Sequence, residues 1–356
     1  MNKQIKALHI LAGSLLLAVS VSSAQEGNSG AEPYLAPVEY PDNVYFGDAH
    51  VHTSLSLDAA AWGSSILPDD AYRYARGEEV PSFKGWKSTL TRPLDWLVIA
   101  DHSDGYDFTN RVAAGDPWII KEELGRRWYE LLQTGGEAER RIVADEIVKG
   151  FGSGGDMPWA LADPEMLAPG WAKTIEAAER HNDPGNFTAF IAYEWSSAPG
   201  GDNLHRVVIY RDDGDKASQT LPLTFDETAD PEDLWKVLQT YEDTTGGQVM
   251  AIAHNGNWSS GQMFSGTRMN GKRLDETYAK NRMRWEPVYE NTQIKGDGEA
   301  HPLLSPDDEF ADFKPGDDQH SGYAALGYEK GVPMGGEVHG DPQAAACWQY
   351  REHPGR

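Results

Sequence analysis

The sequence predicts an α/β protein built on a mainly parallel sheet, and three observations carry this prediction. Short apolar runs rich in β-branched residues alternate with segments whose apolar residues recur at helical spacing. Alternation of this kind is typical of parallel sheets with helices packed on their faces. Polar residues capable of chemistry stand at the ends of the apolar runs, where such folds keep their functional sites.

The elements follow in order along the chain. The strand candidates are residues 44–52, 94–100, 187–193, 204–210, 248–253 and 285–292. Helices are expected over residues 68–76, which begin with proline and acids, and over residues 231–241. Residues 105–185 are expected to be mostly helical, with helices near 118–132 and 137–148, and we interpret them as an insertion that shapes or covers a cleft.

The N-terminus has the features of a secretory signal. Lysines precede a short apolar stretch, and Ser22-Ser23-Ala24 provides small residues for cleavage before Gln25. We expect residues 1–24 to be removed, residues 25–42 to form a leader or linker, and the mature chain to be periplasmic or secreted. The alternative is an uncleaved membrane anchor, which the short and interrupted apolar stretch disfavours. No stable membrane association is expected after cleavage.

Composition excludes some classes of function. The net charge of −25 repels phosphate backbones, so we expect no nucleic-acid partner. The single cysteine, Cys347, excludes an internal disulfide and cysteine-rich zinc sites. The composition leaves the oligomeric state open.

The most informative motif is His50-Val-His52, followed by Asp58. Two imidazoles two residues apart on an extended segment point to the same side, as the ligands of one metal must. The alternative is a pair of hydrogen-bonded polar residues on an edge strand. The nearby carboxylate favours the metal interpretation.

Further candidate ligands stand at or just beyond apolar runs. His102, Glu194 and His254 each follow such a run, whereas His205 opens one and is equally well explained as a hydrogen-bonded core histidine. Asp101 could bind a metal or orient an imidazole, and we expect it to be catalytic. A nitrogen and oxygen donor set without thiols suits two or three divalent cations such as Zn, Mn or Fe.

A polar loop around Lys295 supplies a candidate cation for substrate binding. Lys295 would neutralise an anionic small-molecule substrate, and we expect it to be catalytic, although an ordinary turn is the alternative. Arg206 is a weaker candidate, because on a strand it faces away from His205.

Five segments together resemble the DUF3604 family, which is related to the PHP (polymerase and histidinol phosphatase) superfamily. They are YFGDAHVHTSLSLDA, PLDWLVIADHSDG, AFIAYEWSSAPGGDNLHRVVIYRD, AIAHNGNWSSGQMF and TQIKGDGEAHPLLSPDDEFADF. The resemblance runs from about Asn43 to Phe313 and implies a distorted (β/α)7 PHP-like barrel over residues 43–330. It also implies up to three divalent metals at one mouth of the barrel.

The same resemblance implies roles for the candidate ligands. His50 and His52 resemble ligands of one metal, shared with Glu194, and Asp58 and His102 resemble ligands of a second. Glu194, His254 and His205 resemble ligands of a third.

The chain departs from the family at its C-terminal end. The family pattern closes with an Asp-x-His pair, which this chain lacks, and residues 331–356 form an atypical tail. The resemblance therefore implies a barrel that is incomplete at its C-terminal end and holds fewer than three metals.

The function expected from these residues is that of an exported metal-dependent hydrolase that uses activated water, most simply on a phosphoester. One alternative keeps the chemistry but changes the bond to an amide, a lactone or a sulfate ester. Another is a truncated, non-catalytic remnant that binds metal or ligand without turnover.

Overall fold

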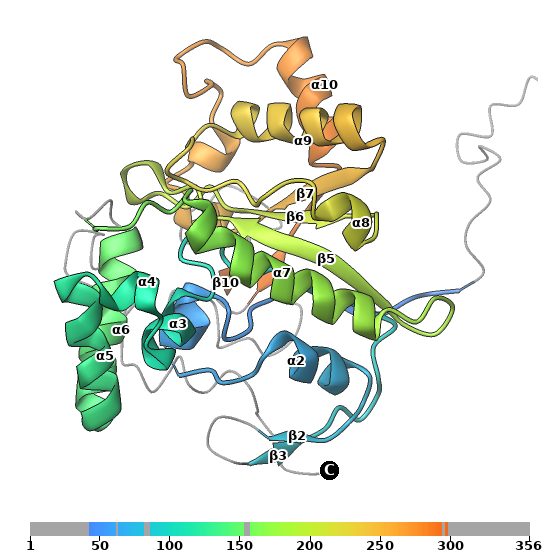
Figure 1. Ribbon diagram of the computed structural model, residues 1–356. Helices are drawn as coiled ribbons and strands as arrows, with labels where there is room; N and C mark the ends of the chain where they lie inside the picture. The colour runs from blue at the N-terminus through green and yellow to red at the C-terminus, as the bar shows by residue number, and fades with distance from the viewer. Residues whose placement is uncertain (1–42, 62, 82–85, 153–156, 294–295, 298–356) are drawn as a thin grey trace, which may run out of the picture. The chain divides into compact units, whose positions relative to one another are not determined.

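The computed structural model describes residues 43–61, 63–81, 86–152, 157–293 and 296–297 (Figure 1). Contacts divide the chain into two units, Met1–Val44 and Tyr45–Arg356, and every element below belongs to the second. The predicted signal segment, residues 25–42, Lys295 and the tail after 331 lie outside the described residues.

A six-stranded sheet organises the fold and curls into a half barrel. Its strand order is β1 (Gly47–Val51), β4 (Trp96–Ile99), β5 (Thr188–Trp195), β6 (Arg206–Tyr210), β7 (Val249–Ala253) and β8 (Val288–Tyr289). Strand β6 is antiparallel to β5 and β7, while the remaining neighbours pair in parallel. The predicted α/β class is confirmed, whereas a seven-stranded PHP-like barrel is not.

The reversal of β6 has a simple physical cause. Only residues 196–205 connect β5 to β6, and they include a short 3-10 segment at Pro199–Gly201. A parallel connection needs a crossover of a dozen or more residues, usually through a helix. The short connection therefore forces an antiparallel return, which places the start of β6 at the carboxyl end of β5.

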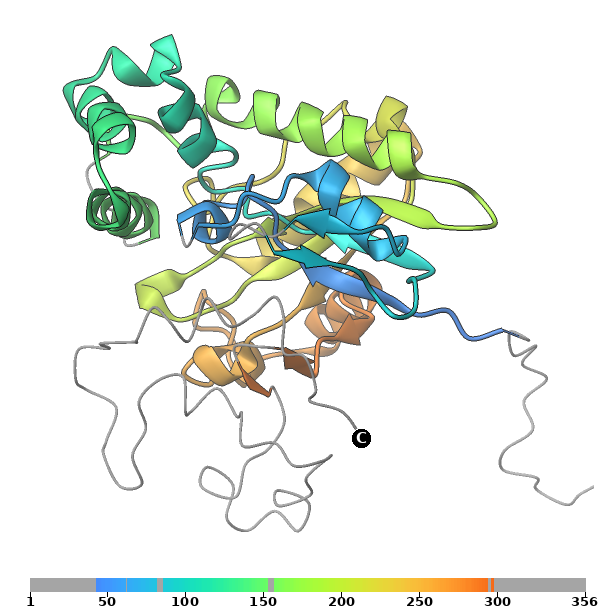
Figure 2. The same cartoon turned by 90° about the horizontal axis from the view of Figure 1, so that it is seen from below.

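Helices cover one face of the sheet. Three of them are α2 (Pro68–Ala75), α7 (Pro164–His181) and α9 (Pro231–Thr245), and in Figure 2 α7 lies along the sheet. Each has proline at its first turn, and an aspartate side chain caps α7 and α9. No helix in the described ranges is both long and apolar enough to cross a bilayer.

Smaller elements complete the sheet region. The remaining helices here are α1 (Leu57–Ala61), α8 (Gly214–Ala217) and α10 (Glu276–Trp285), with 3-10 segments at Gly256–Trp258 and Gln262–Phe264. Two short hairpin pairs join β2 (Val80–Pro81) to β3 (Lys87–Ser88) and β9 (Thr292–Gln293) to β10 (Gly296–Asp297). Helix α10 was not predicted, because its sequence is polar over most of its length.

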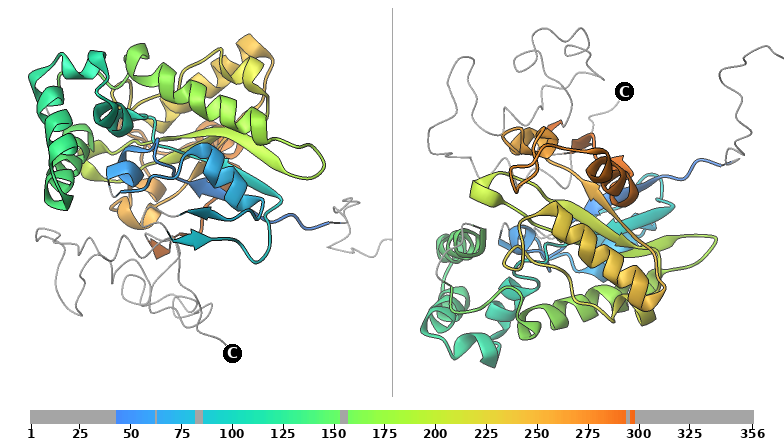
Figure 3. Two further views of the ribbon diagram at one scale, coloured as in Figure 1. Left: turned by 60° about the horizontal axis from the view of Figure 1, so that its bottom comes forward. Right: turned by 90° about the horizontal axis from the view of Figure 1, so that it is seen from above.

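The helical segment predicted within residues 105–185 forms its own small core. It contains α3 (Phe108–Ala114), α4 (Pro117–Ile120), α5 (Glu123–Thr134) and α6 (Glu137–Gly152) before α7 begins. Buried aromatic rings of Phe108, Trp128 and Trp159 pack together within it. All views in Figures 1 to 3 show α5 and α6 to one side of the sheet, away from the helices on its face.

Alternation along the strands separates two apolar clusters. The outer cluster packs beneath the helices and includes Leu97, Ile99, Tyr193, Val208 and Ala251. The inner cluster lies on the opposite face and includes Val98, Ala100, Ala192, Val207 and Ile252. Because strand side chains alternate with period two, residues that continue the inner series beyond a strand end remain on the inner face.

Strand β1 contains an irregularity that changes this alternation. Asp48 pairs with Leu97 and Val51 pairs with Ile99, so β1 contains one residue more than β4 between these two pairs. Ala49 packs against the inner cluster, whereas Val51 packs against the outer cluster. An extra residue in a strand re-aims the side chains that follow it, and here it turns His50 and His52 to the inner face.

Candidate metal centre

Most candidate ligands lie where strands end at one rim of the half barrel. His102 and His254 continue the inner series of β4 and β7, and Glu194 lies near the end of β5 on the same face. His205 precedes β6, and the reversed direction of that strand brings its start to the same rim. The curl and the reversal together gather residues that are far apart in the sequence.

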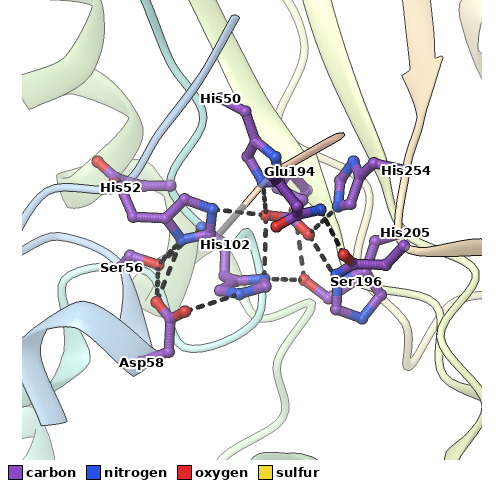
Figure 4. Close-up of polar contacts among 12 residues, drawn as sticks. His50, His52, Ser56, Asp58, His102, Glu194, Ser196, His205 and His254 are labelled. Atoms are coloured by element: carbon purple, nitrogen blue, oxygen red, sulfur yellow. Dashed lines mark hydrogen bonds and ion pairs between the residues drawn. The ribbon is translucent and has the colours of Figure 1, made fainter. Parts of the chain in front are cut away.

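Glu194 is the centre of the cluster. Its carboxylate is fully buried and lies among the histidine side chains labelled in Figure 4. Oε1 lies 2.5 Å from His205 Nδ1 and 2.8 Å from His254 Nε2. Oε2 lies 3.1 Å from His50 Nε2 and 2.8 Å from His52 Nε2, with His102 Nδ1 at 3.8 Å. The single carboxylate of Glu194 therefore lies within 3.8 Å of imidazoles from five separate positions in the chain.

Two donor groups in this cluster have the geometry to hold a metal ion. One is His50, Glu194 and His254, and the other is His52, His102 and Glu194, with donor atoms within 4.8 Å of one another in each. The resemblance had implied that His50 and His52 share one metal. In the structure the two residues fall in different donor groups, and the curl of the sheet brings the ring centroid of His254 within 4.1 Å of that of His50.

Asp58 and two serines complete the group around His52. Ser56 Oγ lies 2.9 Å and Asp58 Oδ1 lies 3.1 Å from His52 Nδ1. Asp58 Oδ2 lies 3.4 Å from His102 Nε2, and Ser196 Oγ lies 2.6 Å from His102 Nδ1. Ser56 and Asp58 thus contact His52 at Nδ1, while its Nε2 faces Glu194. The His102 ring is contacted at both of its nitrogens (Figure 4).

The electrostatics of the cluster favour positive charge. Burial would raise the pKa of Glu194, but the surrounding imidazoles, His102 and His254 first, hold it well below its usual range. Burial would lower the pKa of His52, yet Asp58 and Glu194 raise it to about 10. Burial and the neighbouring His50 hold the pKa of His254 well below its usual value.

These observations fit a divalent cation. Within the described ranges, the buried nitrogen His254 Nδ1 has no hydrogen-bond partner. The field that favours a proton on His52 also favours a metal ion, which would displace that proton. Imidazole and carboxylate donors without thiols suit cations of hard to borderline character. The cluster could therefore hold a metal ion, whose identity the donor set leaves open.

The two predicted catalytic residues have different outcomes. Asp101 continues the outer series of β4 and is fully buried, where it accepts hydrogen bonds from the backbone N–H of Thr53 at 2.5 Å and its hydroxyl at 2.7 Å. Burial raises the pKa of Asp101 to about 6. It thus holds the residue after His52 rather than facing the cluster directly. Lys295 lies outside the described residues.

Arg206 faces away from the cluster, as its position next to His205 predicted. It is buried, and its guanidinium donates from Nε to Glu286 Oε1 at 3.0 Å. Arg206 lies on the same face of β6 as Val208, which belongs to the outer cluster. Its contact with Glu286 links β6 to the end of α10. Arg206 is therefore not available to a substrate at the inner rim.

Glu290 was not among the predicted site residues, yet its Oε2 lies 2.8 Å from His50 Nδ1. It directly follows β8, so it has the same strand-then-carboxylate pattern that identified Glu194. Ser56 and Ser196 were also missed, because hydroxyl residues in loops carry no distinctive pattern. Only the fold places them beside imidazoles.

Comparisons with known proteins agree with the resemblance noted in the sequence. No curated protein and no solved structure matches the chain. One family model, described as a protein of unknown function (DUF3604), matches residues 39–322. This match spans every element of the sheet and all residues of the cluster. The chain therefore belongs to the DUF3604 family.

Proposed function

We propose that this protein is a metal-dependent hydrolase whose centre holds two divalent cations bridged by Glu194. The observation that carries the proposal is the pair of donor groups that share this one buried carboxylate. A shared carboxylate is the usual means of holding two cations about 3.5–4 Å apart in hydrolytic sites. The resident cations would be Zn, Mn or Fe, in keeping with the donor types.

The chain's own residues have separable roles in this proposal. His50 and His254 would hold one cation and His52 and His102 the other, while His205 adds an imidazole at Glu194 Oε1. Asp58 and Ser56 fix the His52 ring, and Asp101 fixes the adjacent backbone at Thr53. Bound cations would lower the pKa of a water molecule toward neutrality and offset charge on the leaving group.

We further propose that the half barrel is PHP-like and that the substrate is a small phosphoester. The order of the five sequence motifs supports the first statement, and the cationic character of a loaded site supports an anionic substrate. Amide, lactone and sulfate ester bonds are hydrolysed by the same kind of centre and belong in the same assay. The lysines and apolar stretch at the N-terminus support export to the periplasm or beyond.

Metal analysis combined with a substrate panel tests the proposal. The purified chain, loaded with Zn, Mn or Fe, is assayed on phosphomonoester, phosphodiester, sulfate ester, lactone and amide substrates. We expect phosphoester turnover that is lost with a chelator and in His52→Ala. His181→Ala is the matched control, because His181 lies outside the cluster and contacts Asp69.

The outcomes separate the alternatives. Turnover of a different bond would retain the centre and change the substrate class. Stoichiometric metal with no turnover on any substrate would contradict catalysis and favour a metal-binding protein. Absence of bound metal under all loading conditions would overturn the centre itself.

A further inference from the structure

Glu290 joins the cluster from the far edge of the sheet. It directly follows β8, while its partner His50 lies in β1, and these two strands are the opposite ends of the strand order. The distance from His50 Nδ1 to Glu290 Oε2 is 2.8 Å, although 240 positions separate the two residues in the chain. The contact therefore exists only because the sheet curls.

The contact is specific to one ring nitrogen. His50 Nδ1 faces Glu290, whereas Nε2 faces Glu194 at 3.1 Å, on the side of the donor group with His254. The other oxygen of Glu290, Oε1, is buried and has no hydrogen-bond partner among the described residues. The contact with His50 is thus what fixes the orientation of this carboxylate.

Histidines that bind metals usually donate their second ring N–H to a carboxylate, which sets the tautomer and the ring orientation. We propose that Glu290 is the positioning residue for His50. It holds a proton on Nδ1 and leaves Nε2 free for a divalent cation shared with Glu194 and His254. This inference rests on the proposed metal centre, but it assigns a role to a residue that the motif pattern did not identify.

The competing explanation is a structural clip between the two sheet edges. A clip would contribute to folding stability and would leave the metal affinity of the folded chain unchanged. Glu286 provides the control, because it lies on the adjoining segment and its carboxylate accepts from Arg206, Arg282 and Trp235 instead of contacting an imidazole of the cluster.

The test measures metal affinity and unfolding separately. Zn²⁺ is titrated into the purified chain against a competing chelator, Co²⁺ is used to record the visible absorption spectrum, and urea unfolding is followed for the metal-free chain. The variants are E290A, E290Q and E286Q. We expect E290A to weaken one Zn²⁺ site by about 10- to 100-fold and to change the Co²⁺ spectrum.

The conservative variant sharpens the result. The amide oxygen of E290Q still accepts from Nδ1–H, so its loss of affinity should be smaller than that of E290A, and it also covers the case in which E290A does not fold. E286Q should lower the unfolding midpoint and leave Zn²⁺ affinity unchanged.

Three results would overturn the inference. If folded E290A and E290Q bind Zn²⁺ like the parent chain, Glu290 does not position His50 and only this inference fails. If the apparent affinity falls only because part of the chain is unfolded, in the E290 variants and E286Q alike, while the folded fraction keeps parent affinity, the clip explanation is correct. If the parent chain binds no divalent cation, the proposed function fails first and the role of Glu290 fails with it.

Discussion

Glu194 and Glu286 are both buried carboxylates, yet their partners differ in kind. Two consecutive residues at the start of β6 contact them. His205 contacts Glu194 on the inner face, and Arg206 contacts Glu286 on the outer face. Glu286 accepts hydrogen bonds from Arg206, Arg282 and Trp235 at 2.9–3.2 Å. Among the described residues, the side chains that contact the Glu194 carboxylate are imidazoles, which can take or release a proton.

The difference separates a structural from an exchangeable arrangement. Burial would raise the pKa of Glu286, but the guanidinium groups of Arg206 and Arg282 keep it below its usual value. That pair is complete, because arginine does not deprotonate in proteins. The positive charge around Glu194 can be exchanged for a metal ion, because its partners are neutral once a proton leaves. Here the permanently charged partners belong to a fold contact, and the titratable ones surround the candidate metal centre.

The largest expected effect comes from Glu194→Gln. The amide cannot bridge two cations, so metal content should fall from about two ions per chain to none, and hydrolysis should disappear with it. Elemental analysis of the purified variant measures this directly. Export should be unaffected, and an unchanged metal stoichiometry would refute the bridging role.

The same removal of a partner on the outer face should affect folding instead. Arg206→Leu leaves Glu286 buried with fewer cations, and breaking a buried ion pair costs about 3–5 kcal/mol. Urea unfolding of the metal-free chain measures the loss. The fraction that remains folded should bind metal with parent affinity, and a loss of affinity without a loss of stability would contradict the comparison.

A third prediction concerns pH. In the metal-free chain, Asp58 and Glu194 overcome the effect of burial and raise the pKa of His52 from 6.5 to about 10. The protonated ring therefore contributes stability that is complete below pH 6.5 and is lost as pH rises toward about 10. Because a cation must displace that proton, metal affinity should rise with pH over the same window, by up to about tenfold per unit for each proton released.

Calorimetric titrations in buffers of different ionisation enthalpy would count those protons. At neutral pH, binding of Zn²⁺ should release at least one proton in the parent chain and fewer in His52→Ala. Equal release in both would show that His52 is not the source.

The smallest effect should come from the residue that caps the N-terminus of helix α7. Asp163 caps α7 by accepting from the backbone N–H of Glu165 at 2.9 Å. Asp163→Ala should cost about 1 kcal/mol of stability, seen as a small shift in the urea midpoint. Metal affinity should not change, and a measurable change would mean that α7 and the cluster are coupled.

Much of the cluster could be predicted because period-two alternation is a local property. His102 and His254 each follow an apolar run by a step that keeps them on the inner face, and Arg206 was correctly expected to face away from His205. The same rule, applied fully, would have placed Asp101 on the outer face. The α/β class followed from similar local patterns.

The rest depends on tertiary structure. The grouping of His50 with His254 requires the curl of the sheet, and the direction of His50 requires the extra residue in β1. Neither feature leaves a pattern in one sequence. The reversal of β6, by contrast, could have been inferred from the shortness of the segment 196–205.

The curl has one more consequence, for the stability of the folded chain. A cation held by His50 and Glu194 would tie together positions 144 residues apart, and the contact to Glu290 extends the tie across 240. Because such a cation binds the folded chain and is released on unfolding, it would stabilise the fold by mass action, by an amount that grows with its free concentration. In a chain with one cysteine, the bound ion would link β1 to β5 and to the end of β7.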